Sequence, residues 1–166
     1  PLAVDPGHPF PFLSNLSLSL GVTVKHPKRD EKLFARIKIP KNIPQWIRIE
    51  TVTDAYKFVN SVSLVRANLQ QLFPHMEVMQ VMQFRVTRNA DIERDEEDAE
   101  DLLEMIEQEL RMRRLADVIR LEHGPSPDPW MLNFLMEELG LSTNDVYEVT
   151  TEHLDYTGLV VIADLA

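Results

Sequence analysis

The sequence predicts an α+β fold, with a mixed, largely antiparallel sheet and packed helices. Two observations carry this prediction. The first fifty residues repeatedly alternate apolar and polar side chains, which is the pattern of strands. From residue 61 onward, helical spacing of apolar residues appears, and helix-like and strand-like segments then succeed each other along the chain. Strands first and interleaved helices later favour α+β over an all-parallel sheet.

The first fifty residues predict three strands. Leucines alternate with serines over 16–20 and the alternation continues to Val24, so we expect a half-buried strand there. The same pattern predicts strands over 34–39 and 46–49, with a proline-containing break between them. Because the links are short, we expect the three strands to form an antiparallel meander.

Helical spacing of apolar residues predicts a helix over 62–72, for which Ser61 is available as the cap and Pro74 is the end. The remaining predicted elements are a strand over 78–86, a helix over 95–112, a strand over 118–121, a helix over 130–139 ended by Gly140, a strand over 146–149, and a terminal helix or connector over 156–165. We expect residues 1–166 to form a single domain that is a fragment of a longer chain.

Charge is unevenly distributed along the chain. The formal net charge is −10, yet residues 1–90 carry a local +6 and residues 111–166 a local −6. Residues 91–110 hold eleven acids against Arg94, a local −10. The acids begin the predicted helix over 95–112 and arginines end it, which suits the helix dipole. Net charge therefore neither excludes a polyanionic ligand nor supports one.

Missing residue types and motifs exclude several classes of function. The absence of Cys excludes disulfides, thiolate zinc sites and cysteine nucleophiles, and is typical of the reducing cytoplasm, where we place the protein. No apolar run approaches the ~20 residues of a transmembrane segment, and no basic stripe with aromatic residues predicts nucleic-acid binding. Without a phosphate-binding glycine loop or a helical histidine pair, we assign no catalytic residue and no metal ligand.

Four arginines are the candidate anion-binding groups. Arg85 and Arg88 flank the end of a predicted strand, and Arg113 and Arg114 lie at the end of the acidic helix. Guanidinium groups bind phosphate oxygens and carboxylates alike. Two interpretations stay open: ion pairs with the many local acids, which are common in proteins, or contact with an anionic ligand.

Several motifs, in order along nearly the whole chain, resemble the polyphosphate kinases that make inorganic polyphosphate from ATP through a phosphorylated histidine. These motifs are PLAVDPGHPFPFLSNLSLSLGV at 1–22, FARIKIP at 34–40, FRVTRNAD at 84–91, DLL at 101–103, ELRMRR at 109–114, VIRLE at 118–122 and LGLSTNDVY at 139–147. The resemblance implies the second, or head, domain of a long multidomain enzyme. It also implies a phosphohistidine-phosphatase-like fold, by analogy of architecture alone.

In that family a histidine accepts the ATP γ-phosphate and passes it to polyphosphate, with Mg²⁺, and both that histidine and its arginines belong to later domains. None of the five histidines here falls in a matching motif, so no catalytic residue is carried over. The resemblance implies no cofactor in this fragment, with Mg²⁺ and ATP used by the parent enzyme. The implied partners are the other domains of its chain, a homodimer partner and polyphosphate, for which the four arginines are the candidate contacts.

Three functional hypotheses follow. The first is a noncatalytic head domain that supports dimerisation and the polyphosphate tunnel, with the fragment inactive alone and the parent chain an ATP-polyphosphate phosphotransferase. The second is a stand-alone enzyme acting on phosphohistidine, which would need a histidine held by a second group. The third is a protein-interaction module that uses the acidic helix to bind a basic partner.

Overall fold

A computed structural model describes residues 2–4, 9–28, 31–50, 55–89, 116–151 and 153–165. The strands are β1 (Leu2–Val4), β2 (Ser19–Lys25), β3 (Lys32–Lys38), β4 (Trp46–Ile49), β5 (Lys57–Asn60), β6 (Glu77–Arg88), β7 (Val118–His123) and β8 (Val146–Glu148). The α-helices are α1 (Ser61–Ala67), α2 (Leu69–Leu72), α4 (Pro129–Leu139) and α5 (Val160–Ala163), and the 3-10 helices are η1 (Thr143–Asp145) and η2 (Thr157–Leu159).

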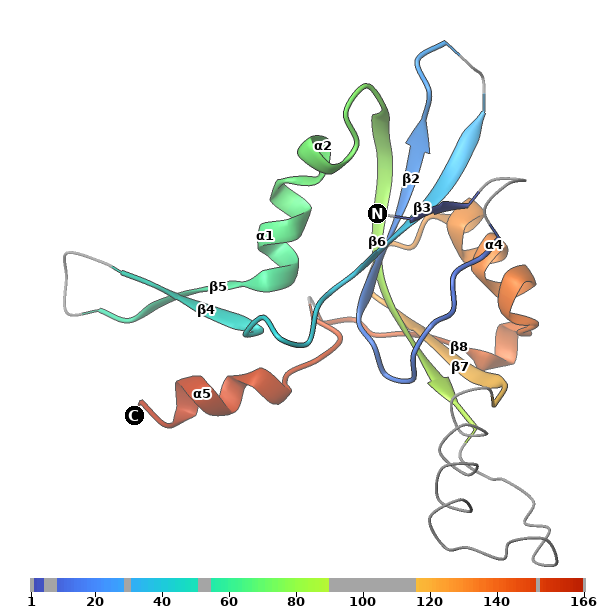
Figure 1. Ribbon diagram of the computed structural model, residues 1–166. Helices are drawn as coiled ribbons and strands as arrows, with labels where there is room; N and C mark the ends of the chain where they lie inside the picture. The colour runs from blue at the N-terminus through green and yellow to red at the C-terminus, as the bar shows by residue number, and fades with distance from the viewer. Residues whose placement is uncertain are drawn as a thin grey trace, which may run out of the picture.

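Six strands form the main sheet, in the order β1-β3-β2-β6-β7-β8 (Figure 1). Neighbouring strands are antiparallel except β7 and β8, which are parallel. The helix α4 covers one face of this sheet, while α1 and α2 lie beside the other. The predicted α+β fold with a mixed, largely antiparallel sheet is therefore confirmed.

The strand β2 lies at the centre of the sheet, between β3 and β6. All its residues except Lys25 are buried, so the prediction of a half-buried strand was wrong. The reason is tertiary: helices cover both faces of the sheet, and Gly21 takes the position beneath α4. A Cβ atom on Gly21 would lie 2.5 Å from Sδ of Met131 in α4, so the helix packs directly against the strand backbone.

The helix α4 ends where the sequence predicts and begins one residue earlier, at Pro129, and both of its ends carry capping residues. Asp128 precedes it and accepts a hydrogen bond from the backbone N–H of Trp130, and Pro129 occupies the first helical position. Gly140 ends the helix in the left-handed conformation, with φ of +65°. Its buried residues Met131 and Leu135 enter the core on the side of α4.

The predicted helix over 62–72 is two short helices instead of one. The chain breaks at Asn68, where α1 ends and α2 begins. The cap of α1 is Asn60 and not Ser61, because the side chain of Asn60 accepts the hydrogen bond from the backbone N–H of Val62. A serine and an asparagine are both good caps, so sequence alone could not choose between adjacent positions.

The predicted meander was wrong, because β4 does not join the main sheet. It pairs with β5 in a separate two-stranded sheet, called the arm below. The strand β2 already pairs with β3 on one edge and with β6 on the other, and the second edge of β3 pairs with β1. The strand β4 therefore has no place beside them, and β1 and β5 were not predicted at all.

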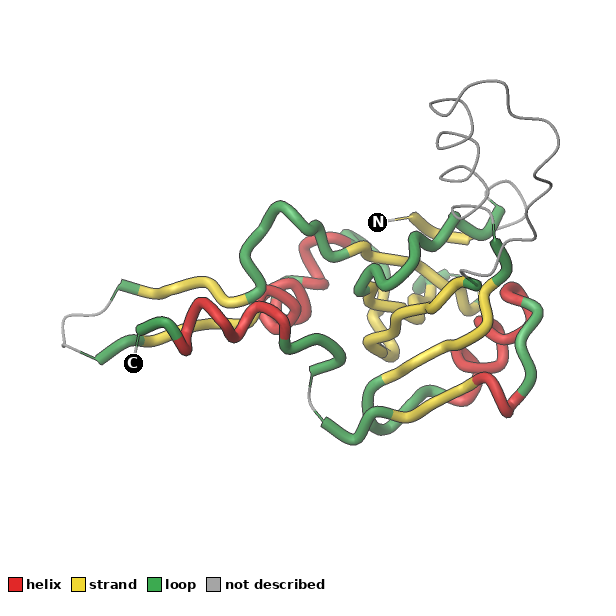
Figure 2. The backbone as a smooth tube through the Cα atoms, turned by 90° about the horizontal axis from the view of Figure 1, so that it is seen from below, coloured by secondary structure: helices red, strands yellow, loops and turns green. Residues whose placement is uncertain are grey.

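The later strands and the terminal helix agree with prediction, with β6 and β7 each longer than expected. The predicted helix over 95–112 lies outside the described residues. Near the end of the described chain, η2 and α5 run alongside the arm, and both views show the pair projecting from the main sheet (Figure 2). The arm and α5 thereby form a second structural feature beside the main sheet.

Candidate functional site

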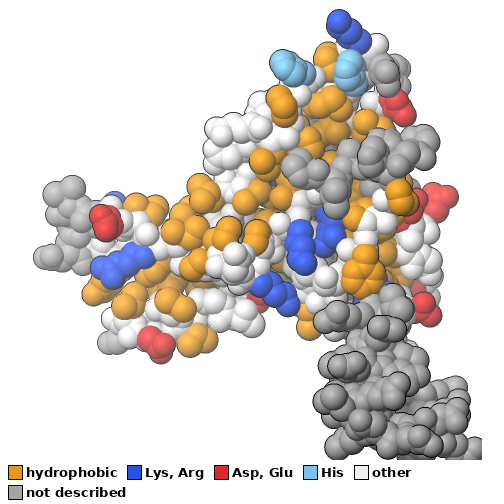
Figure 3. All heavy atoms as spheres, in the orientation of Figure 1, with side chains coloured by type: hydrophobic (Ala, Val, Ile, Leu, Met, Phe, Trp, Pro, Cys, Tyr) orange, Lys and Arg blue, Asp and Glu red, His pale blue; other side chains and the backbone are white. Residues whose placement is uncertain are grey.

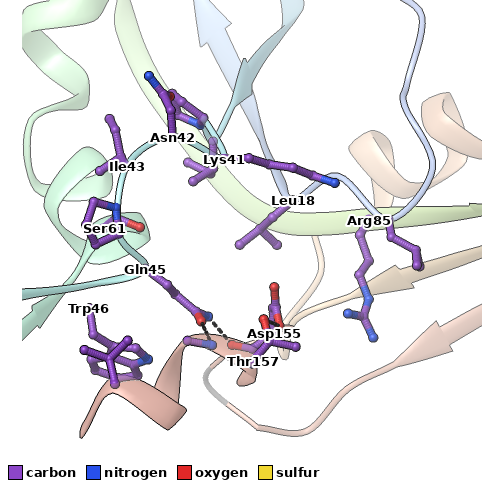
Figure 4. A pocket seen from close by; sticks show the side chains of 16 residues that line it. Leu18, Lys41, Asn42, Ile43, Gln45, Trp46, Ser61, Arg85, Asp155 and Thr157 are labelled. Atoms are coloured by element: carbon purple, nitrogen blue, oxygen red, sulfur yellow. Dashed lines mark hydrogen bonds between the residues drawn. The ribbon is translucent and has the colours of Figure 1, made fainter.

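A pocket of about 700 Å³ lies between the main sheet and the arm (Figure 4). Its lining residues come from the segment before β2, the link from β3 to β4, the start of α1, the strand β6 and the segment around η2. They are Leu16, Leu18, Ile39, Pro40, Lys41, Asn42, Ile43, Pro44, Gln45, Trp46, Ser61, Arg85, Asp155, Thr157, Gly158 and Val161. Lys41 and Arg85 lie on the same side of the pocket, and Asp155 also lines it, so two cations and one carboxylate border the hollow.

Arg85 is the one predicted arginine that lines this pocket in the described part of the chain. Its guanidinium forms an ion pair with Glu122, its register partner on β7. Arg120 also donates to Glu122, over 3.0 Å, and lies 4.1 Å from the ring centre of Tyr147. Burial raises the pKa of Glu122, but the hydrogen bonds and charges of Arg85 and Arg120 outweigh it, so the pKa is lowered. The carboxylate is therefore ionised and shared between two arginines.

Arg88 has a structural role. Its Nε donates to the carbonyl of Leu13 over 2.8 Å, another guanidinium nitrogen donates to the carbonyl of Ala116, and the group lies 4.4 Å from the ring centre of Phe12. Burial lowers its pKa, and the charge of Asp117 partly offsets this. Arg88 thus joins the segment before β2 to the start of β7.

The four predicted arginines are not brought together within the described residues. Arg85 faces the pocket and pairs with a carboxylate, as one of the two sequence interpretations expects, whereas Arg88 binds backbone carbonyls, which neither interpretation predicted. Arg113 and Arg114 lie outside the described residues. Of the two candidate arginines that the structure describes, Arg85 lines the pocket and Arg88 does not; anion contact by any of the four stays a prediction.

Arg36 on β3 was missed by the sequence reasoning. Only 5% of it is exposed, its Nε donates to Oγ of Ser19 over 3.1 Å, and its Nη1 donates to the carbonyl of Phe12 over 2.9 Å. Burial lowers its pKa, and its Nη2 has no hydrogen-bond partner among the residues that the structure describes. No sequence signal marked Arg36, because its burial follows from the covering of both faces of the sheet, which only the tertiary structure shows.

A second missed feature is the side-chain amide of Gln45, which holds the segment around η2 against the arm. Its Nε2 donates to the carbonyl of Asp155, and its Oε1 accepts from the backbone N–H of Gly158 over 2.8 Å. A side chain on Gly158 would collide with Gln45, so only glycine permits this approach. Figure 4 shows both hydrogen bonds at the floor of the pocket.

Aromatic contacts strengthen the same junction. The ring of His153 meets that of Trp46 edge-on, with 5.3 Å between ring centres, and meets that of Tyr156 at 5.9 Å. Leu154, next in the chain, is buried. The segment that leads into α5 is therefore held by side chains from the first half of the chain, a pairing that no local sequence pattern reveals.

Metal-binding and membrane-spanning features were also sought in the described ranges. No group of three potential ligands among His, Asp and Glu side chains occurs there. Nor does any helix of the described chain have both the length and the apolar character that crossing a membrane requires.

Comparison with known families decides how this site is interpreted. Residues 1–162 match the family described as the polyphosphate kinase middle domain. The chain belongs to this family. The matched residues include the main sheet, the pocket and the arm, so all these features are parts of a polyphosphate kinase middle domain.

Curated relatives agree with this assignment. The chain is 44% identical over 152 residues to a polyphosphate kinase of Mycolicibacterium gilvum, covering 90% of this chain and 21% of the relative. It is 45% identical over 158 residues to a polyphosphate kinase of Synechocystis, covering 90% of this chain and 22% of the relative. The chain thus spans about a fifth of the length of these relatives and corresponds to one domain of a larger chain.

The fold is also that of a solved structure, the crystal structure of polyphosphate kinase from Porphyromonas gingivalis. The TM-score is 0.69 and the identity 15%, with 99% of this chain and 22% of that chain covered. At this identity the likeness concerns the fold alone.

The motifs of the polyphosphate kinase middle domain meet in the main sheet. The motif at 1–22 supplies β1 and the start of β2, residues 34–38 of the next motif lie on β3, and residues 84–88 of the motif that begins at 84 lie on β6. The strands β3 and β6 flank β2 on either side. Segments far apart in sequence therefore form one contiguous structural unit.

Proposed function

We propose that this chain is the noncatalytic middle domain of an enzyme that transfers the γ-phosphate of ATP to polyphosphate through a phosphohistidine, with Mg²⁺. In this proposal the domain supports dimerisation and contributes to the wall of the polyphosphate tunnel, and the enzyme works in the cytoplasm. The observation that carries the proposal is the family match along residues 1–162.

The environments of the histidines support the noncatalytic assignment. Within the described ranges, Nδ1 of His26 accepts from the backbone N–H of Lys28, and Nδ1 of His123 lies 2.8 Å from the carbonyl oxygen of Gly124. His153 contacts aromatic rings. A phosphoryl-accepting histidine is oriented by a second polar side chain, typically a carboxylate, and none of these histidines has an ion pair with a described carboxylate.

A direct assay tests this assignment. The 166-residue chain incubated with ATP and Mg²⁺ is expected to make no polyphosphate, while the full-length protein makes it under the same conditions. Polyphosphate synthesis by the short chain alone, or none by the full-length protein, would contradict the proposal. Release of phosphate from a phosphohistidine peptide by the short chain would favour the phosphatase hypothesis instead.

The pocket wall at Arg85 and Lys41 is the proposed point of contact with polyphosphate. Arg85 and Arg120 share the single carboxylate of Glu122, so one positive charge remains uncompensated within that group. Lys41 adds a second on the same side of the pocket, and the carboxylate of Asp155, which also lines the pocket, offsets part of this charge. Guanidinium and ammonium groups bind phosphate oxygens through charge-assisted hydrogen bonds.

Paired variants of the full-length enzyme separate a binding role from a structural one. Arg85→Gln combined with Lys41→Gln is expected to weaken polyphosphate binding and to reduce its dependence on salt. Lys28→Gln, in the polar turn after β2, is the control for loss of one charge. Arg88→Gln is expected to lower stability with little change in polyphosphate affinity. If the double variant binds polyphosphate as the unmodified enzyme does, the pocket wall is not a contact.

A further inference from the structure

The helix α5 is a short apolar helix with no buried residue: Val160 and Val161 are exposed and Ile162 is half-buried. Residues 159–163 read Leu-Val-Val-Ile-Ala. Val160 is 62% exposed and Val161 is 61% exposed. A helix that is apolar all round is typical of a protein interior. The exposed state of α5 therefore indicates that something covers it in the working protein.

The arm beside α5 is also apolar at its surface. Figure 3 shows many hydrophobic side chains over the arm and α5, with a few charged side chains among them. We call this region the apolar arm surface. Its exposed members are Ile43, Ile49, Tyr56, Val160, Val161 and Leu165. Contiguous apolar surface of this kind marks an interaction site.

This surface is built in advance of any partner. The hydrogen bonds of Gln45 to the backbone of Asp155 and Gly158 fix the segment that precedes α5. The rings of Trp46, His153 and Tyr156 pack against each other at the same junction. A surface fixed in this way loses little conformational entropy when a partner binds.

The family match indicates which partner lies closest. It ends at residue 162, within α5, and the curated relatives extend far beyond the fifth of their length that this chain spans. In a longer chain of this family, the polypeptide that follows the middle domain leaves directly from the apolar arm surface. So short a tether gives the following domain a high effective concentration at that surface.

We propose that the apolar arm surface is the docking site for the part of the same polypeptide that follows the middle domain. The inference rests on the proposed function only in taking the chain as one domain of a longer enzyme. Its role would be to set the orientation between the middle domain and the domain after it. A second copy of the protein is the competing occupant, and the experiment below separates the two.

The first measurement is thiol accessibility in the full-length protein. Because residues 1–166 contain no Cys, Val160→Cys places a single thiol in this domain, and Ile119→Cys on β7 is the control with a similarly exposed native side chain. Each labelling rate with a maleimide, located by peptide mass spectrometry, is divided by the rate of the same site in denaturant. We expect residue 160 to be protected roughly tenfold or more relative to residue 119. Equal protection of the two sites overturns the proposal.

The second measurement identifies the occupant. A photo-crosslinking amino acid at Asp164, exposed at the rim, is expected to give a product of monomer mass whose crosslinked peptide lies beyond residue 162. A product of dimer mass means that a second copy covers the surface. A crosslink confined to residues 1–162 means that no segment beyond the middle domain covers it. Either result overturns the proposal. Polyphosphate synthesis is assayed on the same samples. Synthesis without protection of residue 160 contradicts this inference alone, and protection without synthesis contradicts the proposed function alone.

Discussion

Replacing Gln45 by Ala should detach the segment around η2 from the arm without disturbing the main sheet. The substitution removes both hydrogen bonds of the side-chain amide, to the carbonyl of Asp155 and from the backbone N–H of Gly158. A partly buried hydrogen bond contributes about 0.5–1.5 kcal/mol net, so the two together contribute about 1–3 kcal/mol. The population in which this segment is open should therefore rise roughly 5- to 150-fold.

Amide hydrogen exchange of the 166-residue chain, followed by NMR, measures this opening residue by residue. Exchange at Gly158 should accelerate by the factor above, because its N–H loses its acceptor, while amides of β2 should be unaffected. Gln70→Ala is the matched control, since Gln70 also donates to backbone carbonyls, those of Phe73 and Met76, but at the end of α2. Unchanged exchange at Gly158, or equal acceleration at Gly158 and throughout β2, would refute the reasoning.

Three further predictions concern the main sheet. Gly21→Ala should cost about 1–3 kcal/mol in urea unfolding, because the new methyl group collides with Met131; an unchanged midpoint would contradict this packing. Asp128→Ala should cost about 0.5–2 kcal/mol by removing the cap of α4, and Asp128→Asn should restore most of it. Glu122 has a lowered pKa in the folded state, so its ionised form stabilises the fold. This contribution is fully present at pH values above the ordinary glutamate pKa of about 4.3, and it is lost as the pH falls through the folded pKa. The free energy of unfolding of Glu122→Gln should accordingly be lower than that of the unmodified protein at pH 7, and the difference should shrink at pH 3. If the difference does not shrink, the carboxylate charge of Glu122 does not stabilise the fold through Arg85.

Local sequence patterns predicted most elements of this fold and few of its contacts. Capping residues fixed α4 at both ends, since a cap acts within three or four residues of itself. The pairing of β4 with β5 was not predictable in the same way, because strand pairing depends on which sheet edges the rest of the chain leaves free. The doubly buried β2 was misjudged for a related reason: Gly21 carries no apolar side chain to signal burial, but the close packing of α4 on the strand requires a small residue there.

The residues of the candidate site were likewise predicted only in part. Fork-shaped guanidinium groups near a strand end pointed to Arg85 and Arg88, but only the tertiary structure separates the pocket-facing Arg85 from Arg88, which binds the carbonyls of Leu13 and Ala116. The predicted contacts at Arg113 and Arg114 stay predictions. Gln45 carries no local signal, because its partners follow more than a hundred residues later.

The sequence by itself determined the family, the fold class and the positions of most helices and strands. Each of these depends on order along the chain, either as motifs in succession or as apolar periodicity within one element. Only the tertiary structure decided which faces are buried, which arginine meets a pocket and which apolar side chains are left exposed on α5. Those outcomes depend on contacts between segments far apart in the chain, whose energies no local pattern of residues specifies.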